Sequence, residues 1–187
     1  MNYYTELPNN YNEIYKIDAS SKKIGIILNI IATIIFFILF ILLMGIKRIH
    51  FVMDYKSLIY TIIFIISYIL YMVLHELTHG LFYKIYTHQK LTFGLKLSCA
   101  YCGVPNIYVK KNPMIIISIM PFVIFNLLFI QPIFIFDGNL SILFILMFSL
   151  HFGGCSGDLF VVFKLLSLKG NILINDTGPC QTFYKGD

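Results

Sequence analysis

The sequence predicts an all-α membrane protein with about four transmembrane helices and a small β-like cytoplasmic loop between the second and the third. Of its 187 residues, 58% are hydrophobic and only 12% are charged, and the mean hydropathy is +0.81. Both values lie outside the usual range of a soluble domain. In addition, four runs each hold the roughly 20 apolar residues that cross a hydrocarbon core of about 30 Å. We therefore expect a multi-pass protein of the cell membrane, with the lipid bilayer around these runs.

The sequence divides into a polar N-terminal arm and a transmembrane domain with four predicted helices. Residues 1–23 are polar and contain the turn-forming Pro8-Asn9-Asn10, so we expect a loosely ordered N-terminal arm. Residues 24–187 are expected to form a single transmembrane domain. The first apolar run is too long for the hydrophobic region of a signal peptide and has no small-residue cleavage site after it, so we expect it to stay as an anchor. The predicted helices cover residues 24–46, 58–81, 113–136 and 140–166.

Lysine and arginine residues are distributed unequally between the two sides that these helices define. With four crossings, the N-terminal arm, the loop 83–112 and the C-terminal tail share one side, which holds eleven of the fourteen basic residues. Because positive loops are retained in the cytoplasm, we expect both termini and the end of the second helix to be cytoplasmic. The same asymmetry explains the net charge of +5. No basic run interleaved with aromatic residues indicates a nucleic-acid partner, and we expect none.

The loop between the second and third helices alternates apolar and polar residues around Gly94 and Gly103, which indicates two or three short strands. An edge strand there would hold an extended peptide by backbone pairing, but a hairpin that only links two helices explains the pattern equally well. Cys99 and Cys102 form one Cys-x-x-Cys pair, which is a weak zinc signal without a second pair, and the βαβ context of a redox motif is absent. With Cys155 and Cys180 they do not suggest a disulfide framework.

The second predicted helix ends in His75-Glu76-Leu77-Thr78-His79, which fits the pattern His-Glu-x-x-His. Residues four apart lie on one face of a helix, so both imidazoles are able to bind a single zinc ion (Zn²⁺). In this arrangement Glu76 does not bind the metal but acts as the base for a zinc-activated water. Ionisable side chains inside a membrane helix are costly, and Glu76 is the only glutamate after residue 13. A helix end at which these side chains simply meet water is the structural alternative.

A catalytic zinc site needs a third protein ligand and an open position. Position 85 is an isoleucine, which excludes the longer metzincin pattern, and no glutamate follows Glu76. Of the remaining histidines and aspartates downstream, only His151 and Asp158 lie within an apolar run. The remaining downstream candidates are His88, Asp137, Asp176, Asp187 and the cysteines.

At this point the sequence resembles a family. A His-Glu-x-x-His at the cytoplasmic end of one helix, with a later helix that carries an aspartate beside a glycine, resembles the site-2 type of intramembrane metalloprotease. The segments "HELTHG", "IMPFVIFN" and "CSGDL" are more closely similar to a family of small bacterial membrane proteins described as zincin peptidases, over residues 60–180. The resemblance implies that His75 and His79 are metal ligands, that Glu76 is the base and that Asp158 is the third ligand.

The sequence also departs from the site-2 pattern. The site-2 proteases have glycine after the aspartate, whereas here Gly157 precedes Asp158, and the asparagine after Pro121 is Asn126, five residues on. Asn126 is an accessory candidate for an amide that stabilises an oxyanion, with a hydrogen bond between helices as the simpler explanation.

Helix lengths favour Asp158 over His151. His75 lies 17 residues from Leu58 and Asp158 lies 18 residues from Leu140, so both lie roughly 25–27 Å from the same boundary. His151 is only 11 residues along its helix, and we expect it to be an accessory group. The alternative is that Gly153, Gly154 and Gly157 break this helix and bring His151 within reach of the metal as the third ligand. The predicted function is a zinc-dependent, membrane-embedded peptidase that cuts a peptide or membrane-protein substrate near the cytoplasmic face. The alternatives are a non-catalytic zinc-binding or metal-transporting membrane protein and a thiol-redox protein.

Overall fold

The computed structural model describes residues 2–18, 21–49, 55–96 and 99–186, apart from the side chains of Lys96 and Cys99. The chain divides into two compact units. The helical unit comprises Leu28–Leu74 and Phe122–Ser156, and the sheet unit comprises Met1–Ile27, His75–Pro121 and Gly157–Asp187. The helices are α1 (Lys22–Lys47), α2 (Tyr55–Thr87), α3 (Lys111–Ile135), α4 (Gly138–Gly154) and α5 (Ser156–Ser167).

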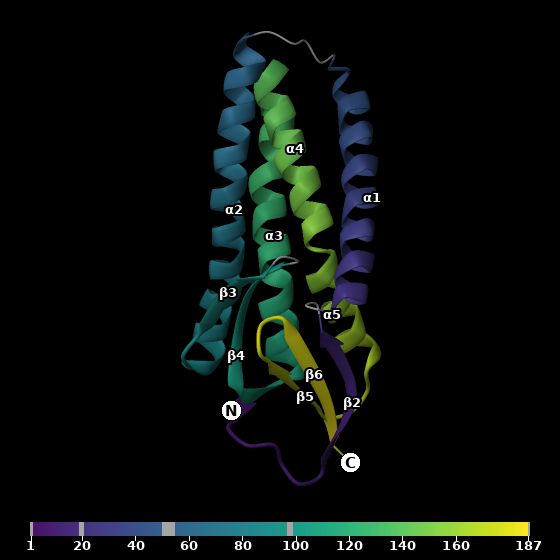
Figure 1. Ribbon diagram of the computed structural model, residues 1–187, viewed down its shortest axis with the longest axis vertical. Helices are drawn as coiled ribbons and strands as arrows, with labels where there is room; N and C mark the ends of the chain where they lie inside the picture. The colour runs from purple at the N-terminus through teal and green to yellow at the C-terminus, as the bar shows by residue number, and fades with distance from the viewer. Residues whose placement is uncertain (1, 19–20, 50–54, 97–98, 187) are drawn as a thin grey trace. The chain divides into compact units, whose positions relative to one another are not determined.

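In the helical unit, long stretches of α1, α2, α3 and α4 lie side by side (Figure 1). Aromatic and aliphatic side chains fill the space between them, among them Tyr71, Phe125 and Phe129. The outer faces are equally apolar, and on α1 the side chains of Ile38 and Ile41 are 60% and 67% exposed. Continuous exposed apolar surface of this kind is rare on soluble proteins and is typical of helices that face lipid.

Among the residues that the structure describes, three helices, α1, α2 and α3, are long and apolar enough to cross a membrane. The consecutive helices α4 and α5 pass the same test as a pair, so the count reaches four if this broken pair is one span. The predicted number of about four apolar spans is thus compatible with the structure.

The helix bounds follow the predicted runs, with two differences. Helix α2 continues to Thr87, six residues past the predicted end, because its last turns pack against the sheet. The predicted fourth helix is interrupted at Cys155, after Gly153 and Gly154, and continues as α5. Glycine weakens a helix because it has the most backbone freedom to lose, and a Cβ at Gly153 would lie 2.5 Å from the carbonyl oxygen of Ala32 on α1.

The sheet is larger than the predicted β-like loop, and the description of the chain as all-α was wrong in this respect. Six strands pair antiparallel in the order β1-β4-β5-β6-β2, with β3 also paired to β4. The expectation of a loosely ordered N-terminal arm was also wrong, because the arm supplies β1 and β2, which pair with strands far along the chain. The strands are β1 (Tyr3–Tyr4), β2 (Tyr11–Asp18), β3 (Thr92–Lys96), β4 (Cys99–Lys110), β5 (Ile172–Asp176) and β6 (Cys180–Gly186).

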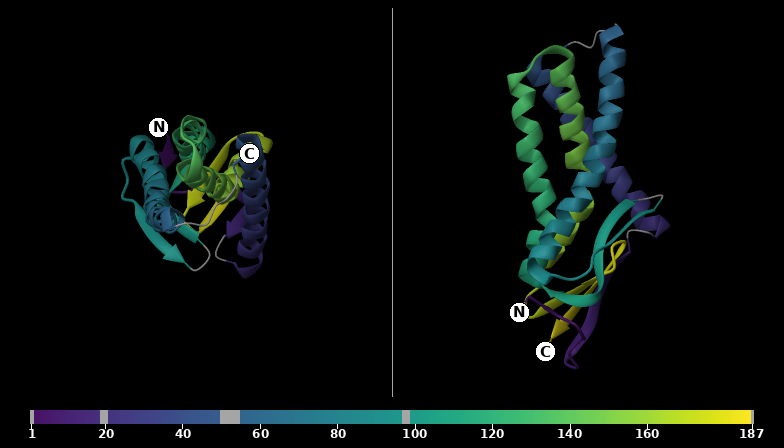
Figure 2. Two further views of the ribbon diagram at one scale, coloured as in Figure 1. Left: turned by 90° about the horizontal axis from the view of Figure 1, so that it is seen from above. Right: turned by 90° about the vertical axis from the view of Figure 1, so that its left-hand side faces the viewer.

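Helical segments of the sheet unit cover one face of this sheet, as the right-hand view of Figure 2 shows. They are the last turns of α2, the first turns of α3 and most of α5. Tyr83, Ile117 and Leu165 from these segments are buried against β4, β5 and β6. Three helices are thereby fixed side by side on one platform, and the candidate site lies among them.

Candidate metal centre

The last turns of α2 carry both motif histidines on one helix face. His75 and His79 are one turn apart, and the centroids of their rings are 5.1 Å from each other. Their side chains are only 11% and 12% exposed. Two nearly buried imidazoles in contact need polar partners, because an unpaired polar group away from water is costly.

Asp158, in the first turn of α5, is the partner of both rings. Its Oδ2 lies 3.2 Å from Nε2 of His75, and its Oδ1 lies 3.4 Å from Nε2 of His79. One ligand atom from each of the three residues lies within 4.8 Å of the other two. Two imidazole nitrogens and one carboxylate oxygen suit zinc and leave a fourth position open. The donor set therefore fits a catalytic zinc ion.

The second ring nitrogen of His79 has its own partner. Nδ1 of His79 lies 2.9 Å from the backbone carbonyl oxygen of Ile117 on α3. A carbonyl oxygen only accepts, so Nδ1 carries a hydrogen and donates it, and Nε2 is left as the nitrogen through which this ring would bind a metal ion. Nε2 is the atom that faces Asp158. Histidine ligands of zinc commonly have such a partner on the far nitrogen.

The β3–β4 hairpin borders the motif on the side of Glu76. The backbone N–H of Cys102 on β4 faces the Glu76 carboxylate. Phe93 on β3 approaches α2 closely beside Gly80, where an added Cβ would lie 2.9 Å from the ring Cζ atom. Gly80 thus allows the hairpin to lie against the helix one residue beyond His79. The strand edge predicted from the sequence does lie beside the motif.

A comparison with protein families agrees with this arrangement. The sequence model of a family described as "Putative zincin peptidase" matches residues 68–173, which is more than half of the chain. The chain belongs to this family. The match to the zincin family includes the four residues His75, Glu76, His79 and Asp158, and the family description suggests a zinc metallopeptidase. No curated protein and no solved structure matches the chain.

The two accessory candidates lie in the helical unit of this zincin-family chain. The ring of His151 is fully buried among Tyr71, Phe122, Phe125 and Phe129, with centroid distances of 5.5–6.0 Å. Its Nδ1 lies 2.8 Å from the Tyr71 hydroxyl and its Nε2 lies 3.3 Å from the carbonyl oxygen of Phe122. These contacts place His151 in the packed core of the helical unit.

Asn126 makes a local hydrogen bond. Its side-chain amide donates to the carbonyl oxygen of Phe122, one turn earlier on α3, at 2.8 Å. The expectation of a hydrogen bond between helices is therefore wrong for this contact, which lies within one helix.

Sequence reasoning missed a second polar contact on the same face of α2. The Tyr83 hydroxyl donates to the buried carboxylate of Asp176 at the end of β5. Asp176 also accepts hydrogen bonds from the backbone N–H of Gly178 at 2.7 Å and from the Gln181 side chain at 3.0 Å. Burial nevertheless raises the pKa of the Asp176 carboxyl to about 6. The signal for Tyr83 was its spacing, four residues after His79.

Cys102 shows no sign of redox chemistry. Burial, together with the negative charges of Glu76 and Asp176, raises the pKa of its thiol to about 12. The thiol therefore stays protonated at neutral pH and is a poor nucleophile. The side chain of Cys99 lies outside the described residues, so the Cys-x-x-Cys pair itself is not described.

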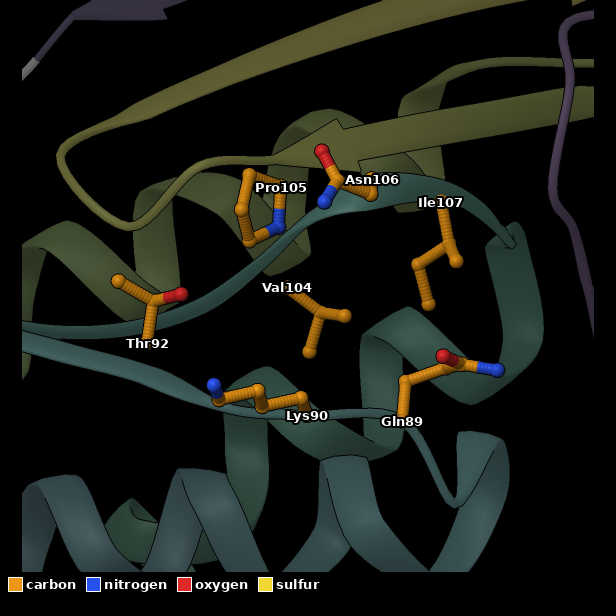
Figure 3. Close-up of a pocket in the computed structure, with 7 residues that line it drawn as sticks. All are labelled: Gln89, Lys90, Thr92, Val104, Pro105, Asn106 and Ile107. Carbon is orange, nitrogen blue, oxygen red and sulfur yellow. The ribbon is translucent and has the colours of Figure 1, made fainter.

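A small pocket opens on the edge of β4 where the strand pairs with neither β3 nor β1. Figure 3 shows Val104 and Ile107 of β4 across from the segment with Gln89 and Lys90. Its volume is about 110 Å³, which is room for a few water molecules. None of the residues that line it is a member of the histidine cluster. The lining residues are Gln89, Lys90, Thr92, Val104, Pro105, Asn106 and Ile107.

Proposed function

We propose that this protein is a zinc-dependent, membrane-embedded peptidase of the site-2 type, which hydrolyses a peptide bond near the cytoplasmic face of the membrane. One observation carries the proposal. His75 and His79 on α2 meet Asp158 on α5 with their ligand atoms within 4.8 Å, and a glutamate follows the first histidine directly. In this proposal His75, His79 and Asp158 hold the metal and Glu76 is the catalytic base.

The proposed roles follow from the chemistry of the side chains. When bound, zinc supplies a Lewis acid that polarises the peptide carbonyl and lowers the pKa of water to roughly 7. The Glu76 carboxylate takes the proton of the attacking water and delivers it to the leaving amine. The Cys102 N–H that faces this carboxylate holds it in one orientation. The low exposure of both histidines keeps bulk water away from the reaction.

Two observations support the proposed position in the membrane: the apolar outer faces of the helices and the unequal distribution of lysine and arginine residues. The outward faces of α1 and α2 are apolar along most of their lengths, and eleven of the fourteen basic residues lie on the side that also carries the end of α2. This supports cytoplasmic termini and a cytoplasmic position for the motif, with α4 and α5 counted as one interrupted span.

The substrate class we propose is an extended peptide or a segment of a membrane protein. Strand β3 pairs with β4, and no further partner of β3 is found among the described residues. Such an edge offers backbone groups to a peptide in the β conformation, and it lies beside Gly80 and the motif.

The test compares three proteins purified in detergent: the wild type, Glu76→Gln and His75→Ala. Bound zinc is measured, and the cleavage of a mixed peptide library is followed by mass spectrometry in the same preparations. The amide of Glu76→Gln cannot accept a proton, so we expect normal zinc content and a loss of cleavage of about 10²–10⁴-fold. His75→Ala should lose both metal and activity. Undiminished cleavage by Glu76→Gln would contradict the mechanism, and zinc binding without cleavage in the wild type would favour the non-catalytic or transporting alternative.

A further inference from the structure

Pro121 lies inside α3, which continues through it from Lys111 to Ile135. Proline has no backbone N–H, so it cannot donate to the carbonyl four residues before it, and its ring pushes that carbonyl out of the helical ladder. The carbonyl four residues before Pro121 belongs to Ile117. This carbonyl oxygen is the one that accepts the hydrogen bond from Nδ1 of His79 at 2.9 Å.

Both partners of this contact lie in a dry environment. Ile117 and Ser118 are 1% and 3% exposed, and the His79 side chain is 12% exposed. A buried carbonyl that has lost its helical donor needs another one, because an unpaired buried acceptor costs about 1–3 kcal/mol. The Nδ1–H of His79 supplies it, and the ring is held by the same bond.

We propose that Pro121 is a positioning residue for the metal site. It keeps the Ile117 carbonyl available to His79, and this bond fixes the ring with its proton on Nδ1 and with Nε2 directed toward Asp158. The inference rests on the proposed zinc function, because it explains how one ligand of that site is oriented. Pro121 touches neither metal nor substrate in this proposal and acts through His79 alone.

The other prolines of α3 provide contrasts. Pro113 lies in the first turn, where an N–H has no helical acceptor in any case. Pro132 lies in the interior of the same helix, and the carbonyl four residues before it belongs to Leu128 in the helical unit. Pro132→Ala is therefore a matched control: it makes the same change in the same helix outside the unit that holds the histidine cluster.

The experiment has two readouts on Pro121→Ala, Pro132→Ala and the wild type. Zinc affinity is measured by competition with a chromogenic chelator. The tautomer of His79 is read by ¹⁵N NMR of histidine-labelled, metal-free protein at a pH where the ring is neutral, with Asp158→Ala added to each protein so that no carboxylate competes for the ring proton. A His79→Ala sample identifies the signal. Pro121→Ala restores an N–H that competes for the Ile117 carbonyl. We expect it to lower zinc affinity by about 10–100-fold and to increase the fraction of ring with its proton on Nε2, while Pro132→Ala changes neither.

The NMR readout separates this inference from the proposed function. If the wild type binds no zinc, the proposed function fails, yet the tautomer of His79 still decides whether Pro121 positions the ring. If His79 carries its proton on Nε2 in the Asp158→Ala protein that keeps Pro121, the inference is overturned, whatever the variants do. Unchanged zinc affinity together with an unchanged tautomer in Pro121→Ala would overturn it as well.

Discussion

Asp158 is the residue whose removal tests the proposed metal site most directly. Its two carboxylate oxygens lie 3.2 Å and 3.4 Å from the Nε2 atoms of His75 and His79, so one side chain serves both rings. Structural zinc sites in zinc-finger peptides bind the ion with a free energy of about 10–16 kcal/mol, which serves here as the reference. If three ligands share this equally, Asp158→Ala removes about 3–5 kcal/mol, which corresponds to a loss of affinity of roughly 10²–10⁴-fold.

The assay is zinc stoichiometry and affinity in detergent-purified protein, with His151→Ala as the companion variant. His151 was the other third-ligand candidate, and it is buried in the helical unit with contacts to Tyr71 and Phe122. We expect His151→Ala to keep its zinc but to lose about 1–3 kcal/mol of stability, because a buried hydrogen-bonding group is removed. Asp158→Asn, which keeps the size of the side chain, should resemble Asp158→Ala in its weakened metal binding.

The result that would refute this assignment is the reverse pattern. Full zinc occupancy in Asp158→Ala, with loss in His151→Ala, would show that the contact of Asp158 with the two histidines is an ion pair and not part of a metal site. Loss of zinc in both variants with an unchanged fold would show that His151 also supports the metal site, against the core-packing role that its contacts indicate.

Two further predictions concern topology and pH. An engineered cysteine near Lys90, in a chain whose own cysteines have been replaced, should react with an impermeant reagent only from the cytoplasmic side, and labelling from outside would refute the orientation inferred from the basic residues. Because the pKa of Asp176 is about 6 in the folded chain against the ordinary 3.8, its contribution to stability is complete below pH 3.8 and is lost as the pH rises through 6, by at most about 3 kcal/mol. Melting temperatures between pH 4 and 7 should therefore fall less in Asp176→Asn than in the wild type, and equal slopes would contradict the pKa shift.

The helices were predictable because a helix that faces lipid needs a long run of apolar residues, and such a run is visible in the sequence itself. Helix α1 differs from its predicted bounds by two residues at the start and one at the end. The sheet was not predictable in the same way. Strand β2 exposes most of its side chains and has Ile17 as its one buried hydrophobic residue, so its sequence lacks a clear alternating pattern. Its partner β6 lies at the opposite end of the chain, and no local signal reveals such a pairing.

The site was predicted partly by local spacing and partly by an argument from helix length. The four-residue spacing of His75 and His79 needs only one regular helix, and α2 supplies it. Equal depths of His75 and Asp158 require a continuous helix from residue 140 to Asp158, but the helix is interrupted at Cys155. Asp158 does meet both histidines, yet the interruption means that this contact is not evidence for the assumed geometry. The resemblance of "CSGDL" to the zincin family indicates Asp158 without that assumption.

One face of α2, which starts at His75, makes polar contacts with α3, α5 and the sheet. These contacts explain why the elements pack together. His75, Tyr83 and Thr87 are buried and the His79 side chain is nearly so, and these four residues follow one another at intervals of four. The partners come from different elements: Asp158 on α5 for both histidines, the Ile117 carbonyl on α3 for His79, and Asp176 on β5 for Tyr83.

Each of these contacts satisfies a polar group that would otherwise be buried unpaired. If one partner moves away, the other is left as a buried polar group without a hydrogen bond, which costs free energy. The contacts therefore restrict α3, α5 and β5 to one arrangement around α2. The residues proposed to bind zinc are thus also part of what holds the sheet unit together. A metal-free chain would keep the cluster assembled through the Asp158 and Ile117 contacts, ready for the ion, and would not need to reorganise when it binds.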